Sequence, residues 1–341
     1  MNAPSDENQS TLNESRRIIV IGAHTILGEL LIDQLEADPR VTEFWVIDLH
    51  APRRKKWKKL HFIKMDLIQP GADAKLAEKF TELNAQTVVH AALKNNPSHH
   101  PSEAHELEVI GSINILSAIK ASRVDKFVFC STTMVYGASG KNPNYIAESA
   151  PLAQNVEAHF VRDKVDAERQ VSYLGLEAPQ VKVSVLRFSL IVGPRSRNYF
   201  TSLLRSPIVP TLLGYDPLFQ FIHEEDARDA LMISVFGDYP GVYNIVGKGV
   251  IPLSYALHES GSWNLPVPSF FAYPLIQVLW NFQLSSVPGQ LFDYFRFLWV
   301  ADGQKAQDIM KFCPKYTSKE AFLELARSKR IQEFKWAPTN Q

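Results

Sequence analysis

Residues 18–28 read IIVIGAHTILG, a short apolar run that turns through glycine into a second apolar segment. The run predicts a strand over Arg17–Ile21, and the spacing after it predicts a helix over Leu27–Leu35. Gly22 permits a tight turn out of the strand, and Gly28 lets the helix pack close to the sheet. The free N–H groups of the first helical turn then face the pyrophosphate of a dinucleotide. The residues expected at that pyrophosphate are Gly22, Thr25, Ile26, Leu27 and Gly28.

An acidic residue follows at the place where such a site needs one. Asp48 ends the next apolar run, twenty residues beyond Gly28. A carboxylate there accepts hydrogen bonds from an adenosine ribose. It also favours NAD as the cofactor, because it would repel the 2′-phosphate of NADP. NADP stays open as the alternative, since basic residues crowd the loop from Arg53 to Lys59 and could pair with that phosphate.

Apolar runs and helical stretches alternate through the first half of the chain. Strands are expected at Arg17–Ile21, Phe44–Asp48, His61–Lys64, Thr87–Ala91, Lys126–Cys130 and Lys182–Leu186. Helices are expected at Leu27–Leu35, Ala74–Leu83, Ala104–Ala121 and Val156–Tyr173. Strands that alternate with helices form βαβ units, and hence a parallel sheet with helices on both faces. We therefore expect an α/β protein with a Rossmann-type, doubly wound parallel sheet and a smaller C-terminal substrate lobe.

The chain of 341 residues divides by composition into three parts. Residues 1–15 are polar and predict a disordered tail. Residues 16–187 carry the alternating pattern and predict the NAD(P)-binding core. Beyond them prolines break the pattern and, from Ile251 onward, aromatic residues become dense, which predicts a substrate lobe over 188–341. Within this lobe, residues 221–247 are expected to return to the core.

Composition excludes several classes of protein. The formal net charge is zero, so no overall attraction to nucleic acid or to anionic lipid is expected. Cys130 and Cys313 stand far apart and in no CxxC pair, which argues against structural zinc and fits a reducing compartment. The N-terminus lacks the features of a signal peptide, and prolines interrupt the uncharged stretch Gly261–Gln290. We therefore expect a cytoplasmic protein without a metal ion, acting on a small molecule.

Further motifs follow one another in a fixed order along the chain. They are Gly22–Gly28, Met65–Leu67, Val88–Ala92, Gly111–Asn114, Ser131–Gly137, Leu186–Arg187, Gly193–Pro194 and Phe221–Asp226. This set resembles the extended short-chain dehydrogenase/reductase family, in its NAD-dependent epimerase/dehydratase group. The resemblance implies hydride transfer at a secondary alcohol or ketone, and a homodimer formed through a pair of helices. It also implies cofactor contacts at Asp66, Leu67, Ala91 and Ala92, and support of the active site by Asn114.

The resemblance also implies an active site, from which one residue is missing. In that family a tyrosine and a lysine, four residues apart on one helix, act with a serine or threonine from the preceding strand end. Lys164 would hold the nicotinamide ribose, and Thr132 would orient the substrate oxygen. The tyrosine position is Phe160, which has no proton to give. Since proton transfer contributes about 10²–10⁴-fold to rate, the usual mechanism should be impaired, and Tyr136 and Tyr145 are the candidate replacement donors.

Three other positions depart from the family's pattern. The middle glycine of the cofactor turn is Thr25. Nucleotide-sugar enzymes of the family usually carry Asn where this chain has Ser189-Leu190, and Arg where it has Phe219-Gln220. These differences disfavour a standard nucleotide sugar as the substrate, and the aromatic C-terminal lobe suits an apolar one.

Three functions stay open on the sequence alone. The first is an NAD(P)-dependent oxidoreductase, dehydratase or epimerase without the usual tyrosine. The second is a catalytically degenerate relative that binds NAD(P) as a regulatory or scaffold protein. The third, which the composition disfavours, is a dehydrogenase that docks on a membrane surface through residues 264–300 and acts on a lipid.

Overall fold

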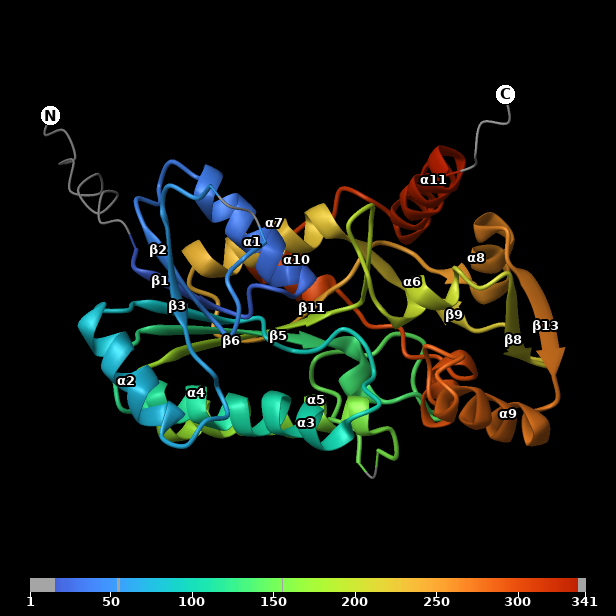
Figure 1. The fold of residues 1–341 in the computed structure, drawn as a ribbon, viewed down its shortest axis with the longest axis horizontal. Coiled ribbons are helices and arrows are strands. Elements are labelled where there is room, and N and C mark those ends of the chain that lie inside the picture. Colours follow the sequence, from blue (N-terminus) through green and yellow to red (C-terminus); the bar gives the residue numbers. More distant parts are fainter. Residues whose placement is uncertain (1–15, 54–55, 155, 337–341) are drawn as a thin grey trace, which may run out of the picture.

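The computed structural model describes residues 16–53, 56–154 and 156–336, so the tail expected over 1–15 lies outside the described residues. Its main sheet holds β1 (Ile18–Ile21), β2 (Phe44–Asp48), β3 (Leu60–Lys64), β4 (Thr87–His90), β5 (Lys126–Thr132), β6 (Lys182–Phe188) and β11 (Gly241–Ile245). These seven strands run in the order β11-β6-β5-β4-β1-β2-β3, and every pairing between them is parallel (Figure 1). The expected doubly wound α/β fold is confirmed.

Helices cover both faces of this sheet (Figure 1). One face carries α1 (Ile26–Ala37), α7 (Glu224–Phe236) and α10 (Gln304–Met310). The other carries α2 (Ala72–Glu82), α3 (Pro101–His105), α4 (Gly111–Lys120) and α5 (His159–Glu177). Strand β1 is buried on both sides, because Ile18 and Val20 pack on the α1 side while Ile19 and Ile21 pack on the opposite side. A continuous apolar run is therefore what this central strand requires.

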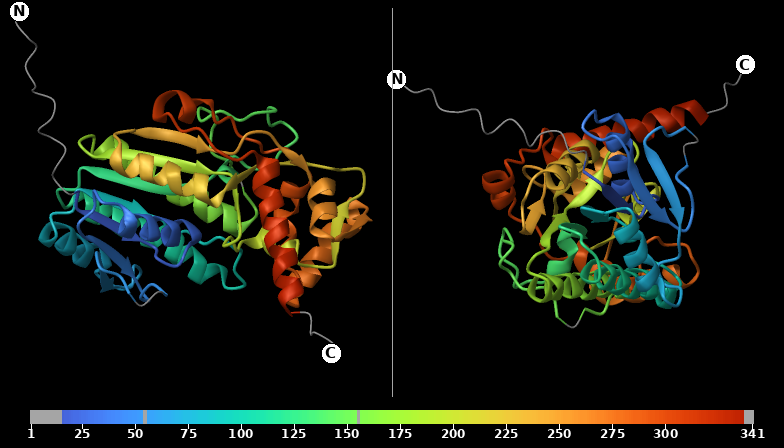
Figure 2. Two further views of the ribbon diagram at one scale, coloured as in Figure 1. Left: turned by 90° about the horizontal axis from the view of Figure 1, so that it is seen from above. Right: turned by 90° about the vertical axis from the view of Figure 1, so that its left-hand side faces the viewer.

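A second lobe stands at one end of the sheet, as the left view of Figure 2 shows. It contains three strand pairs: β7 (Leu190–Val192) with β10 (Phe221–His223), β8 (Ile208–Leu212) with β13 (Trp263–Val267), and β9 (Leu218–Phe219) with β12 (Ile251–Pro252). Its helices are α6 (Tyr199–Leu203), α8 (Leu253–Ser260), α9 (Ser269–Asn281) and α11 (Ser318–Trp336). Much of its core is aromatic, with Phe200, Phe219, Phe221, Phe292 and Phe295 packed together. Among the described residues, no helix combines the length and apolar content needed to cross a bilayer.

One expected helix, Ala104–Ala121, is divided in the structure. A π-helical turn, Glu106–Ile110, joins α3 to α4. At its end the Gly111 N–H donates to the carbonyl of Glu106, five residues back instead of four. The periodicity of apolar residues cannot reveal this turn, because both α3 before it and α4 after it have a buried face. The turn carries Glu108 into the interior, which matters for the site described next.

Candidate cofactor and active site

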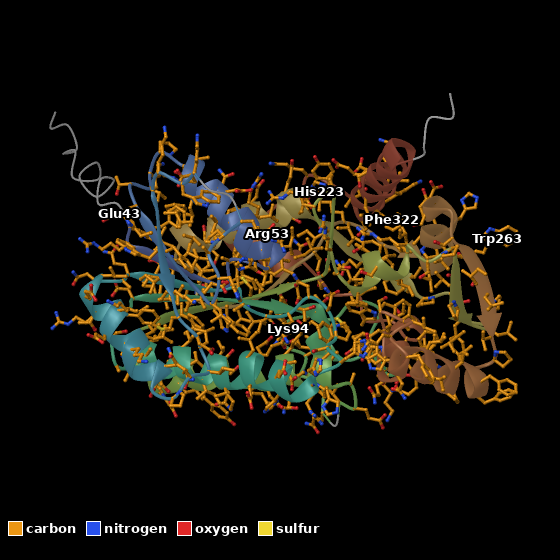
Figure 3. The ribbon with its side chains drawn as sticks, viewed as in Figure 1. Glu43, Arg53, Lys94, His223, Trp263 and Phe322 are labelled. Atoms are coloured by element: carbon orange, nitrogen blue, oxygen red, sulfur yellow. The ribbon has the colours of Figure 1, made fainter. Side chains whose placement is uncertain are left out.

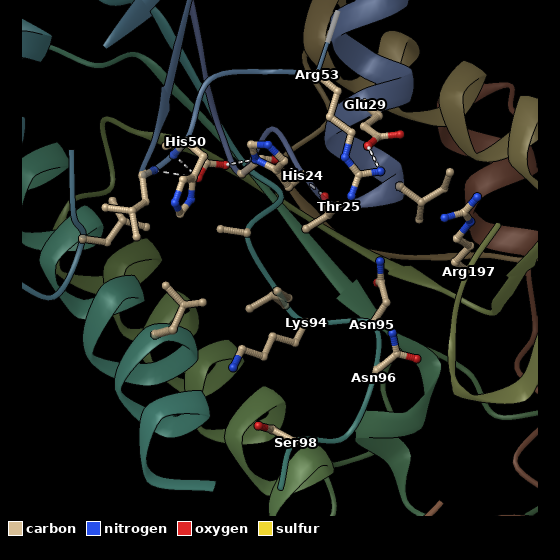
Figure 4. Close-up of a pocket in the computed structure, with 18 of the residues that line it drawn as sticks. His24, Thr25, Glu29, His50, Arg53, Lys94, Asn95, Asn96, Ser98 and Arg197 are labelled. Atoms are coloured by element: carbon tan, nitrogen blue, oxygen red, sulfur yellow. Dashed lines mark hydrogen bonds and ion pairs between the residues drawn. The ribbon is translucent and has the colours of Figure 1, made fainter. Parts of the chain in front are cut away.

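A cavity of about 880 Å³ opens where the carboxyl ends of β1, β2 and β4 meet (Figure 4). Its lining includes Gly22, Asp48, Asp66 and Ala92. The chain first adds β2 and β3 on one side of β1 and then crosses over to place β4 on its other side. Open parallel sheets bind their ligands at such a change of direction. The cavity therefore lies where a dinucleotide is expected.

Close backbone packing explains both glycines of the cofactor turn. Gly22 has a φ of +100°, and a Cβ there would lie 2.5 Å from the N and Cα of Ala92. A Cβ on Gly28 would lie 1.8 Å from the Gly22 carbonyl oxygen. Both positions thus exclude any side chain, and the turn rests directly on the segment that follows β4.

Thr25, at the position of the missing middle glycine, forms the N-cap of α1. Its hydroxyl accepts a hydrogen bond from the Gly28 N–H at 3.0 Å and donates to the Gly22 carbonyl at 3.3 Å. Since the first N–H groups of a helix have no partner within it, those of Ile26 and Leu27 are left for a ligand. Thr25 therefore stabilises the start of α1 as its N-cap. The N–H groups of Ile26 and Leu27 still point to the place where an anion would bind.

Asp48 lies at the mouth of the same turn. Its Oδ2 accepts a hydrogen bond from the Ala23 N–H at 2.7 Å, and its Oδ1 accepts one from the Leu49 N–H at 2.6 Å. Arg53, from the basic loop, pairs instead with Glu29 of α1 at 3.6 Å (Figure 4). Arg54 and Lys55 of that loop lie outside the described residues. The Asp48 carboxylate would repel a 2′-phosphate, and Arg53 is already paired with Glu29. Both observations favour NAD over NADP.

Asp66 and Leu67, which the resemblance places at the adenine, line the cavity just beyond the end of β3. Asp66 Oδ1 accepts a hydrogen bond from the Ile68 N–H at 3.1 Å, which fixes the turn after β3. Asn114 donates from Nδ2 to the Leu67 carbonyl at 2.7 Å. The Asn114 side chain thus faces the segment after β3 and is not among the residues that line the cavity at Thr132, and its expected support of the active site stays a prediction.

A smaller cavity, of about 80 Å³, adjoins the first and shares Thr25 and Lys94 with it. Thr132, Phe160 and Lys164 all line it, so the structure brings the three expected active-site positions together. The Thr132 hydroxyl accepts a hydrogen bond from the Met134 N–H at 3.3 Å, and its own proton stays available for a substrate oxygen or another acceptor.

Lys164 forms a buried ion pair that the sequence reasoning missed. Its Nζ lies 3.0 and 3.1 Å from the two carboxylate oxygens of Glu108 and donates to the Lys94 carbonyl at 2.8 Å. Glu108 Oε1 also accepts the Lys94 N–H at 2.7 Å. Burial raises the pKa of the Glu108 carboxyl, and the Lys164 ammonium only partly opposes this. The sequence offered one sign that Glu108 is buried. It lies four positions before Ser112, and so on the same inward face of the expected helix.

Phe160 packs between this ion pair and a second residue that the sequence reasoning missed, Tyr199. Lys164 Nζ lies 4.3 Å from the centre of the Phe160 ring, and Tyr199 meets that ring edge-on at 6.0 Å. The Tyr199 hydroxyl donates to the sulfur of Met134 at 3.5 Å, and burial raises its pKa. Of the two tyrosines proposed as donors, Tyr136 is bound to Asn244 at 2.6 Å, and Tyr145 is exposed.

Phe160→Tyr is expected to create a phenol with a pKa below the usual value of about 10, because the Lys164 ammonium favours its ionised form. The difference in tyrosinate absorbance between variant and parent, followed against pH, measures this pKa. Phe270→Tyr is the matched control, since Phe270 is 70% exposed and lines none of the site's cavities. Identical titration of the two new phenols would contradict the placement of Lys164 over position 160.

The family model described as NAD dependent epimerase/dehydratase matches residues 18–245. An uncharacterised protein of Mycobacterium tuberculosis is 28% identical over 320 residues, covering 92% of this chain and 84% of that protein. The UDP-glucose 4-epimerase of Mycoplasma genitalium is 26% identical over 179 residues, which are 50% of this chain and 51% of that enzyme.

Solved structures show the same fold. MoeE5 in complex with UDP-glucuronic acid and NAD superposes with a TM-score of 0.71 at 19% identity, over 93% of this chain and 99% of that chain. The UDP-glucose 4-epimerase of Thermus thermophilus, in complex with NAD, gives 0.70 at 20% identity, over 92% and 99%. The family's stated dependence on NAD agrees with the cofactor expected from Asp48. Its model spans most of the chain, so the protein belongs to the NAD dependent epimerase/dehydratase family.

Proposed function

We propose that the protein binds NAD in the larger cavity and uses it as the hydride acceptor or donor at a secondary alcohol or ketone. The observation that carries the proposal is the adjacent smaller cavity, where Lys164 and Thr132 stand together beside the cofactor turn. Lys164 would hold the nicotinamide ribose, and Thr132 would orient the substrate oxygen through a hydrogen bond from its hydroxyl. The N–H groups of Ile26 and Leu27 would bind the pyrophosphate, and Asp48 the adenosine ribose.

We propose a substrate other than a standard nucleotide sugar, although relatives such as the Mycoplasma enzyme are named for one. Where those enzymes usually carry arginine, this chain has the uncharged pair Phe219-Gln220, whose polar member is Gln220. This side chain is buried and binds both the N–H and the carbonyl of Ala301, at 3.0 and 3.1 Å. It therefore serves to hold the chain and offers no positive charge to a diphosphate.

The test is to denature the purified protein and identify any released nucleotide by mass spectrometry, and then to measure thermal stabilisation by added NAD and NADP. A bound ligand raises the melting temperature to an extent set by its concentration relative to Kd. We expect stabilisation by NAD, and reduction of bound NAD by one member of a panel of secondary alcohols. Binding without reduction across the panel would support the degenerate, regulatory alternative, and the absence of any binding would overturn both.

Asp48→Ala should weaken NAD binding by about 1–3 kcal/mol, because it removes an acceptor from the ribose and leaves the Ala23 N–H unpaired. It should also narrow the preference for NAD over NADP, since no carboxylate then opposes the 2′-phosphate. Calorimetric titration with both nucleotides measures this. Asp73→Ala, at an exposed position of α2 outside the cavity lining, is the control. An unchanged preference would contradict the role given to Asp48.

A second candidate function, at a lipid surface, is favoured by α9. Phe271, Leu275, Val278 and Phe282 follow one another at helical spacing, and all four are exposed. The opposite face of the helix packs inward through Ala272 and Ile276. A helix that is apolar on both faces normally has both covered. The outer face of α9 therefore lacks the cover that its composition requires.

We propose hydrocarbon as that cover because residues 261–292 carry no charged side chain and thus match the charge-free interior of a bilayer. Trp263, at the far end of the lobe in Figure 3, is 78% exposed, and Phe282 is 73% exposed. Protruding aromatic rings of this kind insert at membrane interfaces. On its inner side α9 contributes Trp280 to a cavity of about 190 Å³ that also contains Phe160. A lipid-like substrate could therefore reach the active site from this surface.

Sedimentation with vesicles of phosphatidylcholine and phosphatidylglycerol at low salt tests this second candidate. We expect the protein to bind the vesicles, and the double variant Phe271→Ser, Phe282→Ser to stay in solution. Leu176→Ser is the matched control, because Leu176 is 79% exposed on α5. Protein that stays in solution with vesicles present would contradict the proposal. A dimer that the same double variant disrupts would identify a second copy of the chain as the cover.

A further inference from the structure

The buried pair of Lys164 and Glu108 offers what Phe160 lacks, a place for a proton. Both residues are almost completely buried, and the pair joins two cavities. Lys164 lines the cavity with Thr132, and Glu108 lines the neighbouring cavity with Lys94 and Asp163. Within the described part of the chain, the titratable residues that line the cavity at Thr132 are Lys94, Cys130, Lys164 and Tyr199. Among these side chains, that of Lys164 is the one that contacts a buried carboxylate, Glu108.

We propose that the Lys164–Glu108 pair takes up the proton released by the substrate hydroxyl, in place of the tyrosine that the family normally uses. The inference rests on the proposed function. The alcohol carbon loses a hydride to NAD, and the alcohol oxygen loses its proton to Lys164 Nζ. As it does so, Lys164 passes one of its own protons to Glu108. The alcohol becomes a carbonyl. The pair begins as the Lys164 ammonium and the Glu108 carboxylate, and it ends as the ammonium and the neutral carboxylic acid.

Charge balance in the buried site supports this step. The ammonium and the carboxylate together carry no net charge before the proton arrives, and they carry one positive charge afterwards. Hydride transfer to bound NAD would remove one positive charge from the site. The total charge of the site thus stays constant, which a desolvated environment strongly favours.

The surroundings of Glu108 fit a group that can accept a proton. Lys164 and Asp163 face it from α5, and the backbone of Lys94 binds it from the loop after β4. Burial raises its pKa, and the nearby Asp163 carboxylate adds to this rise. Asp163 is itself paired with His105 at 2.8 Å.

Three further histidines lie near this pair. His90, on β4, binds Ser112 at 2.9 Å, and burial lowers its pKa to about 3, so it stays neutral. His99 and His159 line the same cavity as Glu108. Because histidine is the side chain that most often changes charge near neutral pH, a test must separate Glu108 from these residues and from His105.

The test compares the binding of NAD⁺ and NADH between pH 6 and 9 by calorimetric titration of the full chain. If reduction of the nicotinamide raises the proton occupancy of the pair, the ratio Kd(NADH)/Kd(NAD⁺) must rise with pH, by up to about tenfold per pH unit. Glu108→Gln should make this ratio independent of pH, while keeping a hydrogen-bond acceptor for Lys164. Glu106→Gln, at an exposed position of the same π-helical turn, should leave it unchanged.

The outcomes are separable. If neither nucleotide binds, the proposed function fails. If both nucleotides bind to the parent protein but the ratio Kd(NADH)/Kd(NAD⁺) does not change with pH, the proton does not go to the pair. The inference is then overturned, whatever the variants do. A pH dependence that survives in Glu108→Gln but vanishes in Tyr199→Phe would assign the proton to Tyr199 and would also overturn it.

Discussion

Lys164→Met is expected to destabilise the protein by about 3–5 kcal/mol, because it leaves the Glu108 carboxylate buried without its partner. It should also abolish stabilisation by NAD, since the ribose contact is lost with the amine. Urea unfolding followed by tryptophan fluorescence measures the first effect, and thermal melting with NAD measures the second. The double variant Lys164→Met, Glu108→Gln should recover most of the stability but none of the NAD binding.

The stability loss in Lys164→Met should depend on pH in a known direction. Burial raises the pKa of Glu108 above its usual value, and removing the ammonium raises it further. A group whose pKa is higher in the folded state favours folding at low pH, and this contribution is lost as pH rises through the folded-state pKa. The variant should therefore approach the parent near pH 5 and fall behind it toward pH 8.

Lys120→Met provides the matched control for this experiment. Lys120 pairs with Glu177 at 2.9 Å in an exposed position, where ion pairs contribute little. We expect a small change that is insensitive to pH over the same range. Equal losses in the two lysine variants would show that the Lys164 pair is not buried as described.

Gly28→Ala should cost about 3 kcal/mol or more and prevent NAD binding, because its Cβ would meet the Gly22 carbonyl oxygen at 1.8 Å. The backbone fixes the position of a Cβ, and its clash partner is a backbone oxygen, so no change of rotamer can relieve the clash and α1 must move away from the cofactor turn. The same unfolding and NAD titration experiments measure the two effects.

Gly175→Ala is the control for the glycine experiment. Gly175 is exposed near the end of α5, and a Cβ there would meet no heavy atom within 4 Å. Alanine should stabilise the helix by about 0.5–1 kcal/mol. If Gly28→Ala bound NAD as the parent does, the turn at residues 22–28 would not hold the pyrophosphate.

The sheet could be predicted because its signal is local. Strand β2 coincides with the expected Phe44–Asp48, since a strand buried on both faces needs an unbroken apolar run. The cofactor turn could also be predicted, because the spacing of Gly22 and Gly28 reflects two close backbone contacts. The glycine motif is recognised from its spacing alone, although one of these contacts, between Gly22 and Ala92, joins residues far apart in the chain.

The contacts within the active site could not be predicted, because they join residues that are far apart in the sequence. Glu108 and Lys164 are 56 positions apart, and Phe160 meets Tyr199 across two elements. Asn114 was assigned to the active site from a motif, yet the direction of its side chain depends on the phase of α4. Such pairings follow from packing, which periodicity along one segment does not describe.

The strand order has a consequence for synthesis on the ribosome. Strand β1 emerges first and becomes interior; β2 and β3 then add on one side of it, and β4, β5 and β6 on the other. Each new strand of this series joins an edge that already exists, so no strand must insert between two others. The cofactor turn, Asp48, Thr132 and Lys164 are all translated before the second lobe begins at β7. We therefore expect a growing chain to form its nucleotide-binding half while the lobe that would select the substrate is still being made.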